Sequence, residues 1–303
     1  MSGRGALAAG AALLVLATAP ALGQDVVAQP EVVAPAPENG PRRPLLEIGV
    51  AGGGGFVPAY PASDQNRVRG IVAPYIIYRG DLFRADDQGA RARAFRSDWL
   101  ELAISASGGF RADSSDIRAR QGMPDLDWLG EIGPTLQITL YRDLSAGRPR
   151  RLLLDLPVRA VFSTDLTSIH TRGFTFAPDI AWEERNLFFP GSRLRLSFGS
   201  TFGTDRYTSY FYEVKPEFAR PGRPAYDARA GYVGSRVSMS YRVPLTSRIS
   251  VIVGGRVENF SGAANADSPL FRSEWGFSVA AGFSWALWRS DATVSATAEP
   301  FSE

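Results

Sequence analysis

The stretch that decides the fold is residues 275–288, WGFSVAAGFSWALW. Large apolar side chains occupy nearly every second position, and glycine, serine or alanine fill most of the positions between them. Successive side chains of a β-strand point to opposite faces, so this pattern predicts a strand with one apolar face and one face of small residues. A solvated sheet face usually carries scattered charged and polar residues. Small residues are more typical of a strand that lines a narrow lumen.

The same alternation recurs from Leu45 onward in segments of about ten residues, as expected for membrane-spanning strands, and no 3.6-residue period competes with it. Residues 151–162 and 192–203 show it well, with Arg159 and Arg195 on the faces opposite their leucines. Aromatic residues gather toward the ends of the apolar faces. This combination indicates a lipid-facing and a lumen-facing set of side chains.

We therefore predict an all-β fold, a closed antiparallel transmembrane β-barrel of about twelve strands. The expected strands are 45–54, 67–79, 81–87, 91–97, 99–110, 128–142, 151–162, 172–184, 192–203, 230–243, 248–260 and 273–288. Short links are expected near 143–150, 185–191 and 244–247, and long links near 111–127, 163–171, 204–229 and 261–272. In bacterial barrels the short turns are periplasmic and the long loops extracellular, so both ends of this barrel are expected in the periplasm.

The flanking segments predict export to the outer membrane of a Gram-negative bacterium. Residues 1–23 have the pattern of a signal peptide, with a short apolar stretch and small residues that suit cleavage before Gln24. Residues 24–44 are rich in proline and alanine and predict an extended periplasmic linker. The barrel is then expected over 45–288, followed by a C-terminal tail over 289–303.

Composition excludes several classes of function. The chain has no Cys and one His, which rules out disulfides, thiolate metal sites and multi-His zinc sites. The formal charge is +2, and no Lys/Arg block could follow a phosphate backbone, so nucleic-acid binding is not expected. Asp125 and Asp127 lack the glycine-bracketed loop of a calcium site. We expect no cofactor and no metal.

One pair of residues could carry chemistry. In an extended chain Ser168 and His170 share a face, as a lipid hydrolase with a Ser/His pair would require. No nearby carboxylate clearly orients the ring, and the segment is interpreted as a solvated loop. The aromatic loop 204–229 permits two further hypotheses, a surface adhesin or a plug that packs into the barrel mouth. A fourth alternative is a narrow solute channel in which lumen arginines favour anions: Arg159, Arg193, Arg195, Arg236 and Arg256.

Four segments carry a resemblance to the MipA/OmpV family of outer-membrane proteins. They are GVAGGGGFVPAYPASDQNRVRGIVAPYIIYRGD (49–81), GMPDLDWLGEIGPTLQITLY (122–141), YFYEVKPEFARPGRPAYDARAGY (210–232) and NADSPLF (265–271). The motif positions in the loops are Pro58, Tyr60, Ser63, Asp64, Tyr210, Phe211, Pro216, Pro224, Tyr226, Asp267, Ser268 and Pro269. The chain departs from the family pattern at Glu213 and Arg223, which stand where Gly and Leu are expected, and it continues beyond Trp288.

The resemblance implies a non-enzymatic barrel that contacts outer-membrane lipid. One relative in this family is a scaffold that joins a lytic transglycosylase to a peptidoglycan synthase. The expected function is therefore a scaffold or anchor for peptidoglycan-remodelling enzymes. The linker 24–44 and the periplasmic turns are the segments placed to meet such partners.

Overall fold

The computed structural model describes residues 42–79, 84–86, 89–91, 93–97, 99–144 and 147–295. The expected signal peptide, its cleavage site, most of the linker and the end of the tail lie outside these residues. So does part of the hairpin expected over 80–97.

The described chain is almost entirely antiparallel β-structure. The main sheet contains β2 (Leu46–Pro58), β3 (Asn66–Arg79), β4 (Arg84–Asp86), β5 (Gly89–Arg91), β6 (Arg93–Arg96), β7 (Leu100–Gly109), β8 (Trp128–Asp143), β9 (Arg150–Thr164), β10 (Ile169–Phe176), β11 (Asp179–Arg185), β12 (Arg193–Gly203), β13 (Gly231–Pro244), β14 (Ile249–Asn259) and β15 (Trp275–Arg289). A separate pair joins β1 (Arg42–Pro44) to β16 (Thr293–Ser295). The helical elements are α1 (Asp205–Tyr212) and the short 3-10 turns η1 (Ser114–Asp116), η2 (Arg118–Arg120) and η3 (Pro216–Phe218).

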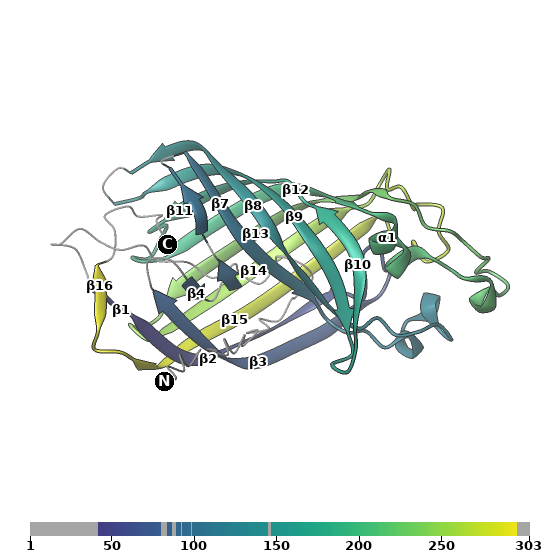
Figure 1. Ribbon diagram of the computed structural model, residues 1–303, viewed down its shortest axis with the longest axis horizontal. Helices are drawn as coiled ribbons and strands as arrows, with labels where there is room; N and C mark the ends of the chain where they lie inside the picture. Colours follow the sequence, from purple (N-terminus) through teal and green to yellow (C-terminus); the bar gives the residue numbers. More distant parts are fainter. Residues whose placement is uncertain are drawn as a thin grey trace, which may run out of the picture.

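The main sheet curls round on itself into the expected barrel (Figure 1). The long strands β2 and β15, far apart in sequence, pair along most of their length. At the two ends of the strand order, β5 pairs with β4 and β6 pairs with β7, and β5 also lies against β7. Sequence-adjacent β5 and β6 therefore bring the two ends of the sheet together.

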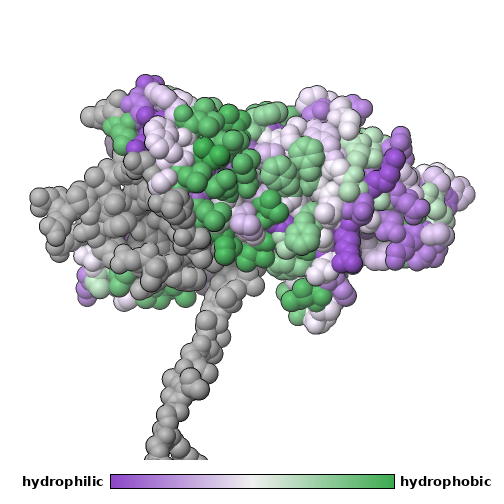
Figure 2. All heavy atoms as spheres, turned by 45° about the horizontal axis from the view of Figure 1, so that its top comes forward, coloured by the Kyte–Doolittle hydropathy of each residue, from purple (hydrophilic) through white to green (hydrophobic). Residues whose placement is uncertain are grey.

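The two faces of the strands match the predicted alternation. On β15, Phe277 and Val279 are 57% and 61% exposed, whereas Ser278 between them is 2% exposed. Figure 2 shows hydrophobic residues over the middle of the barrel and hydrophilic residues toward the end where the loops gather. Large apolar side chains left exposed in this way suit a lipid solvent, and each strand of the sheet pairs its backbone with its neighbours, as a membrane requires.

The expected strand 172–184 is interrupted but keeps its register. Phe176 lies opposite Val158 of β9, and Asp179 lies opposite Asp155, so both chains advance by three residues across the break. Pro178 in the break has no N–H to donate, which explains the missing ladder bond. Side chains of β11 therefore stay on the faces that the alternation predicts.

The long loop expected near 163–171 is absent. β9 continues to Thr164 and β10 begins at Ile169, which leaves a tight turn between them. The carboxylate of Asp165 closes this turn by accepting hydrogen bonds from the backbone N–H groups of Thr167 and Ser168, at 2.9 and 2.8 Å. An aspartate that caps the following residues is a common turn device, and it converts the expected loop into a hairpin.

The links at the two ends of the barrel differ strongly. At one end, which we call the turn end, residues 144–149, 186–192 and 245–248 connect strands. At the other, the loop end, the long segments 59–65, 110–127, 204–230 and 260–274 fold together with α1. β1 and β16 lie near the turn end (Figure 1).

Candidate functional site: a charge-paired lumen and a folded cap

A buried carboxylate on β11, Glu183, is the centre of an ion-pair cluster in the lumen. Its side chain has no exposed surface, and its two oxygens accept hydrogen bonds from Arg151, Arg193 and Arg195 at 2.7, 2.6 and 2.6 Å. Strand register brings these groups together, because Glu183 lies opposite Arg151 of β9 and Arg195 of β12. A carboxylate removed from water requires such donors, so the three arginines stabilise its charge.

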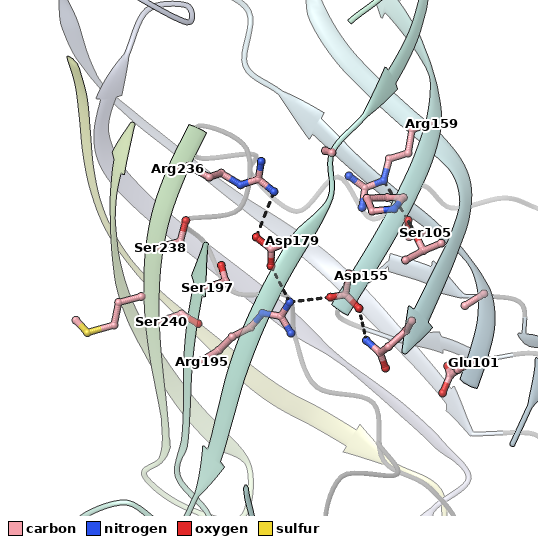
Figure 3. A pocket seen from close by; sticks show the side chains of 16 residues that line it. Glu101, Ser105, Asp155, Arg159, Asp179, Arg195, Ser197, Arg236, Ser238 and Ser240 are labelled. Atoms are coloured by element: carbon pink, nitrogen blue, oxygen red, sulfur yellow. Dashed lines mark hydrogen bonds and ion pairs between the residues drawn. The ribbon is translucent and has the colours of Figure 1, made fainter. Parts of the chain in front are cut away.

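Arg195 extends the cluster toward the middle of the barrel (Figure 3). Its guanidinium contacts Asp155 at 2.9 Å and Asp179 at 3.3 Å. Asp179 also faces Arg236 at 3.5 Å, and Gln137 donates to Asp155 at 2.7 Å. The interactions therefore connect five neighbouring strands of the wall, β8, β9, β11, β12 and β13.

A second polar group lies on the neighbouring strands β7, β8 and β9. Arg159 donates to Ser105 at 3.0 Å and lies 3.7 Å from Glu131. Ser107 donates to the same glutamate at 3.0 Å. These lumen-facing side chains of β7, β8 and β9 thus bond to one another.

The space that remains between these groups is small. The cavity lined by Glu101, Asp155, Arg159, Asp179, Arg195 and Arg236, with several small polar residues, has a volume of about 50 Å³. A cavity of this size has room for water.

The lumen arginines do not supply the free positive charge that an anion channel would use. Each of the five lies close to one of four carboxylates. Arg193 and Arg195 both form ion pairs with Glu183. The other three distances are Arg159 to Glu131 at 3.7 Å, Arg236 to Asp179 at 3.5 Å and Arg256 to Glu258 at 3.9 Å. In the part of the lumen that the structure describes, these five arginines are therefore paired with carboxylates, and their charge does not by itself support a preference for anions.

The four long loops form a compact body, which we call the cap and define as residues 59–65, 110–127, 204–230 and 260–274. Its apolar centre contains Tyr60, Ile117, Tyr207, Phe211 and Tyr212, none of which is more than 4% exposed. Tyr207 and Phe211 meet edge-to-face with ring centroids 5.3 Å apart. Tyr207, Phe211 and Tyr212 of the aromatic loop 204–229 therefore pack against the neighbouring loops and are buried there.

Several motif positions join different loops of the cap. The Tyr60 hydroxyl donates to the carbonyl of Leu270 at 2.7 Å, and the Ser268 hydroxyl donates to the carbonyl of Tyr212 at 2.7 Å. Tyr226 donates to Asn265 at 3.3 Å. These hydrogen bonds cross more than thirty residues of sequence each and fix the loops relative to one another.

The remaining motif positions are less tightly integrated. Phe211 and Tyr210 of α1 meet edge-to-face, and Asp64 forms an ion pair with Arg118 at 3.1 Å. The others lie at chain positions that shape the loops or face solvent: Pro58 ends β2, Ser63 accepts from the N–H of Gln65, Pro269 lines a surface pocket, and Pro216, Pro224 and Asp267 are exposed.

Two buried arginines in the cap were not predicted as site residues. Arg120 donates to the carbonyls of Phe211 and Pro124, and its burial lowers the pKa of its guanidinium to about 10, so that it stays charged at neutral pH. Arg223 donates to the carbonyls of Phe218, Ala119 and Gln121. Nothing local in the sequence distinguishes them from solvated loop arginines, because their partners are backbone oxygens of distant segments.

The Ser168–His170 pair forms a hydrogen bond, but its carboxylate neighbour does not have the arrangement of a catalytic triad. The serine hydroxyl lies 3.2 Å from His170 Nε2 and 3.1 Å from the carboxylate of Asp165. Catalysis would need the carboxylate on the far side of the histidine, where it orients the ring and stabilises its charge. Here the acid accepts from the serine. Asp165 and His170 are exposed and Ser168 is half-buried, and Asp165 has a lowered pKa because it accepts backbone hydrogen bonds in the turn.

Among the described residues, no group of three or more acidic or histidine side chains could hold a metal ion. No helix in the same part of the chain is long and apolar enough to cross a membrane.

An apolar belt, a charge-paired interior and a folded loop cap together define this molecule as a transmembrane β-barrel of the outer membrane. The chain belongs to the family described as MltA-interacting protein MipA, whose model matches residues 50–287.

Solved structures with similar architecture are distant. A bacterial polysaccharide outer membrane secretin is 10% identical with a TM-score of 0.38, and the match covers 81% of this chain and 99% of that one. The NanC porin is 9% identical with a TM-score of 0.36, covering 78% and 100%. The CymD monoaromatic hydrocarbon channel is 10% identical with a TM-score of 0.30, covering 81% and 90%. No curated protein sequence matches the chain.

Proposed function

We propose that this protein is a non-enzymatic barrel that anchors peptidoglycan-remodelling enzymes at the periplasmic face of the outer membrane. The observation that carries the proposal is the cross-strand ion-pair cluster around Glu183 and Arg195, which joins neighbouring strands of the barrel wall through their lumen-facing side chains. A wall cross-linked in this way suits a rigid anchor.

The turn end supplies the surface that a periplasmic partner would meet. Exposed apolar side chains lie in three of its turns: Leu144 is 40% exposed, Phe188 82% and Leu245 61%. Phe188 also has a positive φ of 68°, an unfavourable conformation for an aromatic residue, and such strain is often retained at functional positions. The last three residues of the expected linker 24–44 form β1 near the same end.

The partner class follows from the family. Its name records an interaction with MltA, and the expected partners are a lytic transglycosylase and a peptidoglycan synthase. The test is affinity recovery of these enzymes from detergent-solubilised envelopes, with the full-length chain compared with a chain lacking residues 24–44 and with Phe188→Gly.

Leu166→Gly is a matched control for Phe188→Gly. Leu166 is also 82% exposed with a positive φ, of 76°, but it lies in the turn between β9 and β10 at the loop end. We expect enzyme recovery to fall for the linker deletion or for Phe188→Gly and to stay unchanged for Leu166→Gly. Failure of the full-length chain to recover any peptidoglycan enzyme would refute the proposal.

The second candidate is a narrow solute channel, which the polar lining of the 50 Å³ cavity favours. It requires the ion pairs around Arg195 to open, and it predicts a steady current across a planar bilayer.

A further inference from the structure

An arginine-rich pocket lies on the cap, apart from the lumen and the turn end. It has a volume of about 460 Å³, and its lining includes Arg118, Arg220, Arg223 and Arg272. These arginines come from three different loops of the cap. Asp64 is the one acidic side chain among the lining residues. The pocket therefore has a formal excess of positive charge.

A tight turn places two of these arginines side by side. In the sequence Arg220-Pro221-Gly222-Arg223, the backbone N–H of each arginine donates to the carbonyl of the other, at 2.9 and 2.8 Å. Proline at the second position and glycine with a φ of 78° at the third fit a type II turn. Like charges held opposite one another are destabilising unless an anion lies between or beside them.

The arginines of this turn differ in their freedom to bind. Arg223 is buried and its donors are directed at carbonyls of Phe218, Ala119 and Gln121, so it is a fixed part of the pocket floor. Arg220 uses one nitrogen on the carbonyl of Arg118 and is otherwise exposed. Burial, and then repulsion from Arg220, lowers the pKa of Arg223, as expected for two neighbouring cations.

The other two arginines complete the pocket rim. Arg118 is exposed and forms an ion pair with Asp64 at 3.1 Å. Arg272 is exposed, and among the described residues its guanidinium makes no hydrogen bond or ion pair, although its backbone N–H is fixed on the carbonyl of Ala62. Arg220 and Arg272 therefore retain guanidinium donors for a ligand.

We propose that this pocket binds a phosphate monoester group, carried either by a glycolipid of the outer leaflet or by a soluble sugar phosphate. A phosphate monoester has close to two negative charges and three acceptor oxygens, so it can receive several arginines at once, whereas a carboxylate is occupied by one bidentate guanidinium. The loop end is the extracellular end of a bacterial barrel, where such groups are presented.

The test measures binding of inorganic phosphate to the purified full-length protein in detergent, by calorimetry at pH 8. Arg220→Gln and Arg272→Gln are compared with Arg206→Gln, which removes an exposed arginine of the same cap that does not line the pocket. We expect about tenfold weaker binding for each of the first two variants, since each removes a charge-assisted hydrogen bond. Arg206→Gln should bind as the wild type does.

A second arm identifies the source of the phosphate. The protein is placed in phosphatidylcholine nanodiscs with or without diphosphoryl lipid A, and its thermal stability is compared with that in soluble glucose 6-phosphate. A rise in either condition that is lost in Arg220→Gln supports the site and assigns the carrier. Absence of phosphate binding, equal binding of acetate, or an equal loss in Arg206→Gln would overturn the proposal.

Discussion

Glu183→Gln removes one negative charge from the lumen without changing the size of the side chain. In the wild type this carboxylate accepts hydrogen bonds from three arginines at 2.6–2.7 Å and has no exposed surface. The amide would remove the negative charge that Arg151, Arg193 and Arg195 share at this position. Removing one partner of a buried ion pair costs about 3–5 kcal/mol, so we expect a loss of that size in the free energy of unfolding.

The adjacent glutamate is the control. Glu184 also bonds to an arginine, Arg148, but that guanidinium is 58% exposed, and exposed pairs contribute about 1 kcal/mol or less. Both variants are measured by guanidinium-induced unfolding in lipid vesicles, followed by tryptophan fluorescence. Equal stability of Glu183→Gln and Glu184→Gln would refute the claim that the lumen cluster holds the barrel together.

Three further predictions concern the cap and the lipid face. Tyr60→Phe leaves the buried carbonyl of Leu270 without its donor, which should cost about 1–3 kcal/mol and speed hydrogen exchange in residues 260–274; unchanged exchange would contradict the interlocked cap. The N–H of Ser114 and the guanidinium of Arg111 lower the pKa of Asp125, so the ionised side chain stabilises the cap above its ordinary pKa, and this stabilisation is lost as the pH falls through the lowered value. Hydrogen exchange of residues 110–127 against pH should show the loss in the wild type and not in Asp125→Asn. Val279→Arg places a charge on the lipid face and should cost about 2–4 kcal/mol in vesicles, whereas Val279→Leu should cost little.

The faces of the barrel could be predicted from the sequence because the period of a strand is fixed. In β15 the exposed series through Phe277 and Val279 follows directly from the alternation, and the same rule places Arg195 in the lumen. The break at Ala177-Pro178 escaped prediction, because a proline alone does not reveal that the register continues past it.

The ion-pair partners in the lumen and the contacts between loops in the cap could be predicted less well. Glu183 and Glu184 are adjacent acidic residues. Only the alternation of side chains along β11 decides that Glu183 is the buried centre of the cluster and that Glu184 pairs with Arg148 outside it. The cap depends on pairings between loops far apart in sequence, such as Tyr60 with Leu270, for which a single sequence carries no local signal. The hairpin turn at 165–168 does have a local signal, because Asp165 stands two residues before Thr167 and three before Ser168, from whose N–H groups it accepts hydrogen bonds. From the sequence, this segment is nevertheless interpreted as a long loop.

The conductance of the purified full-length protein in a planar bilayer tests the closed lumen most directly. Arg195 is paired with Glu183, Asp155 and Asp179 on the lumen wall, and the cavity between these groups has a volume of about 50 Å³, so we predict no steady current at moderate voltage. Glu183→Gln, which disturbs this cluster, should show at most brief openings. A steady ohmic current through the wild-type protein would contradict the account and favour the solute channel.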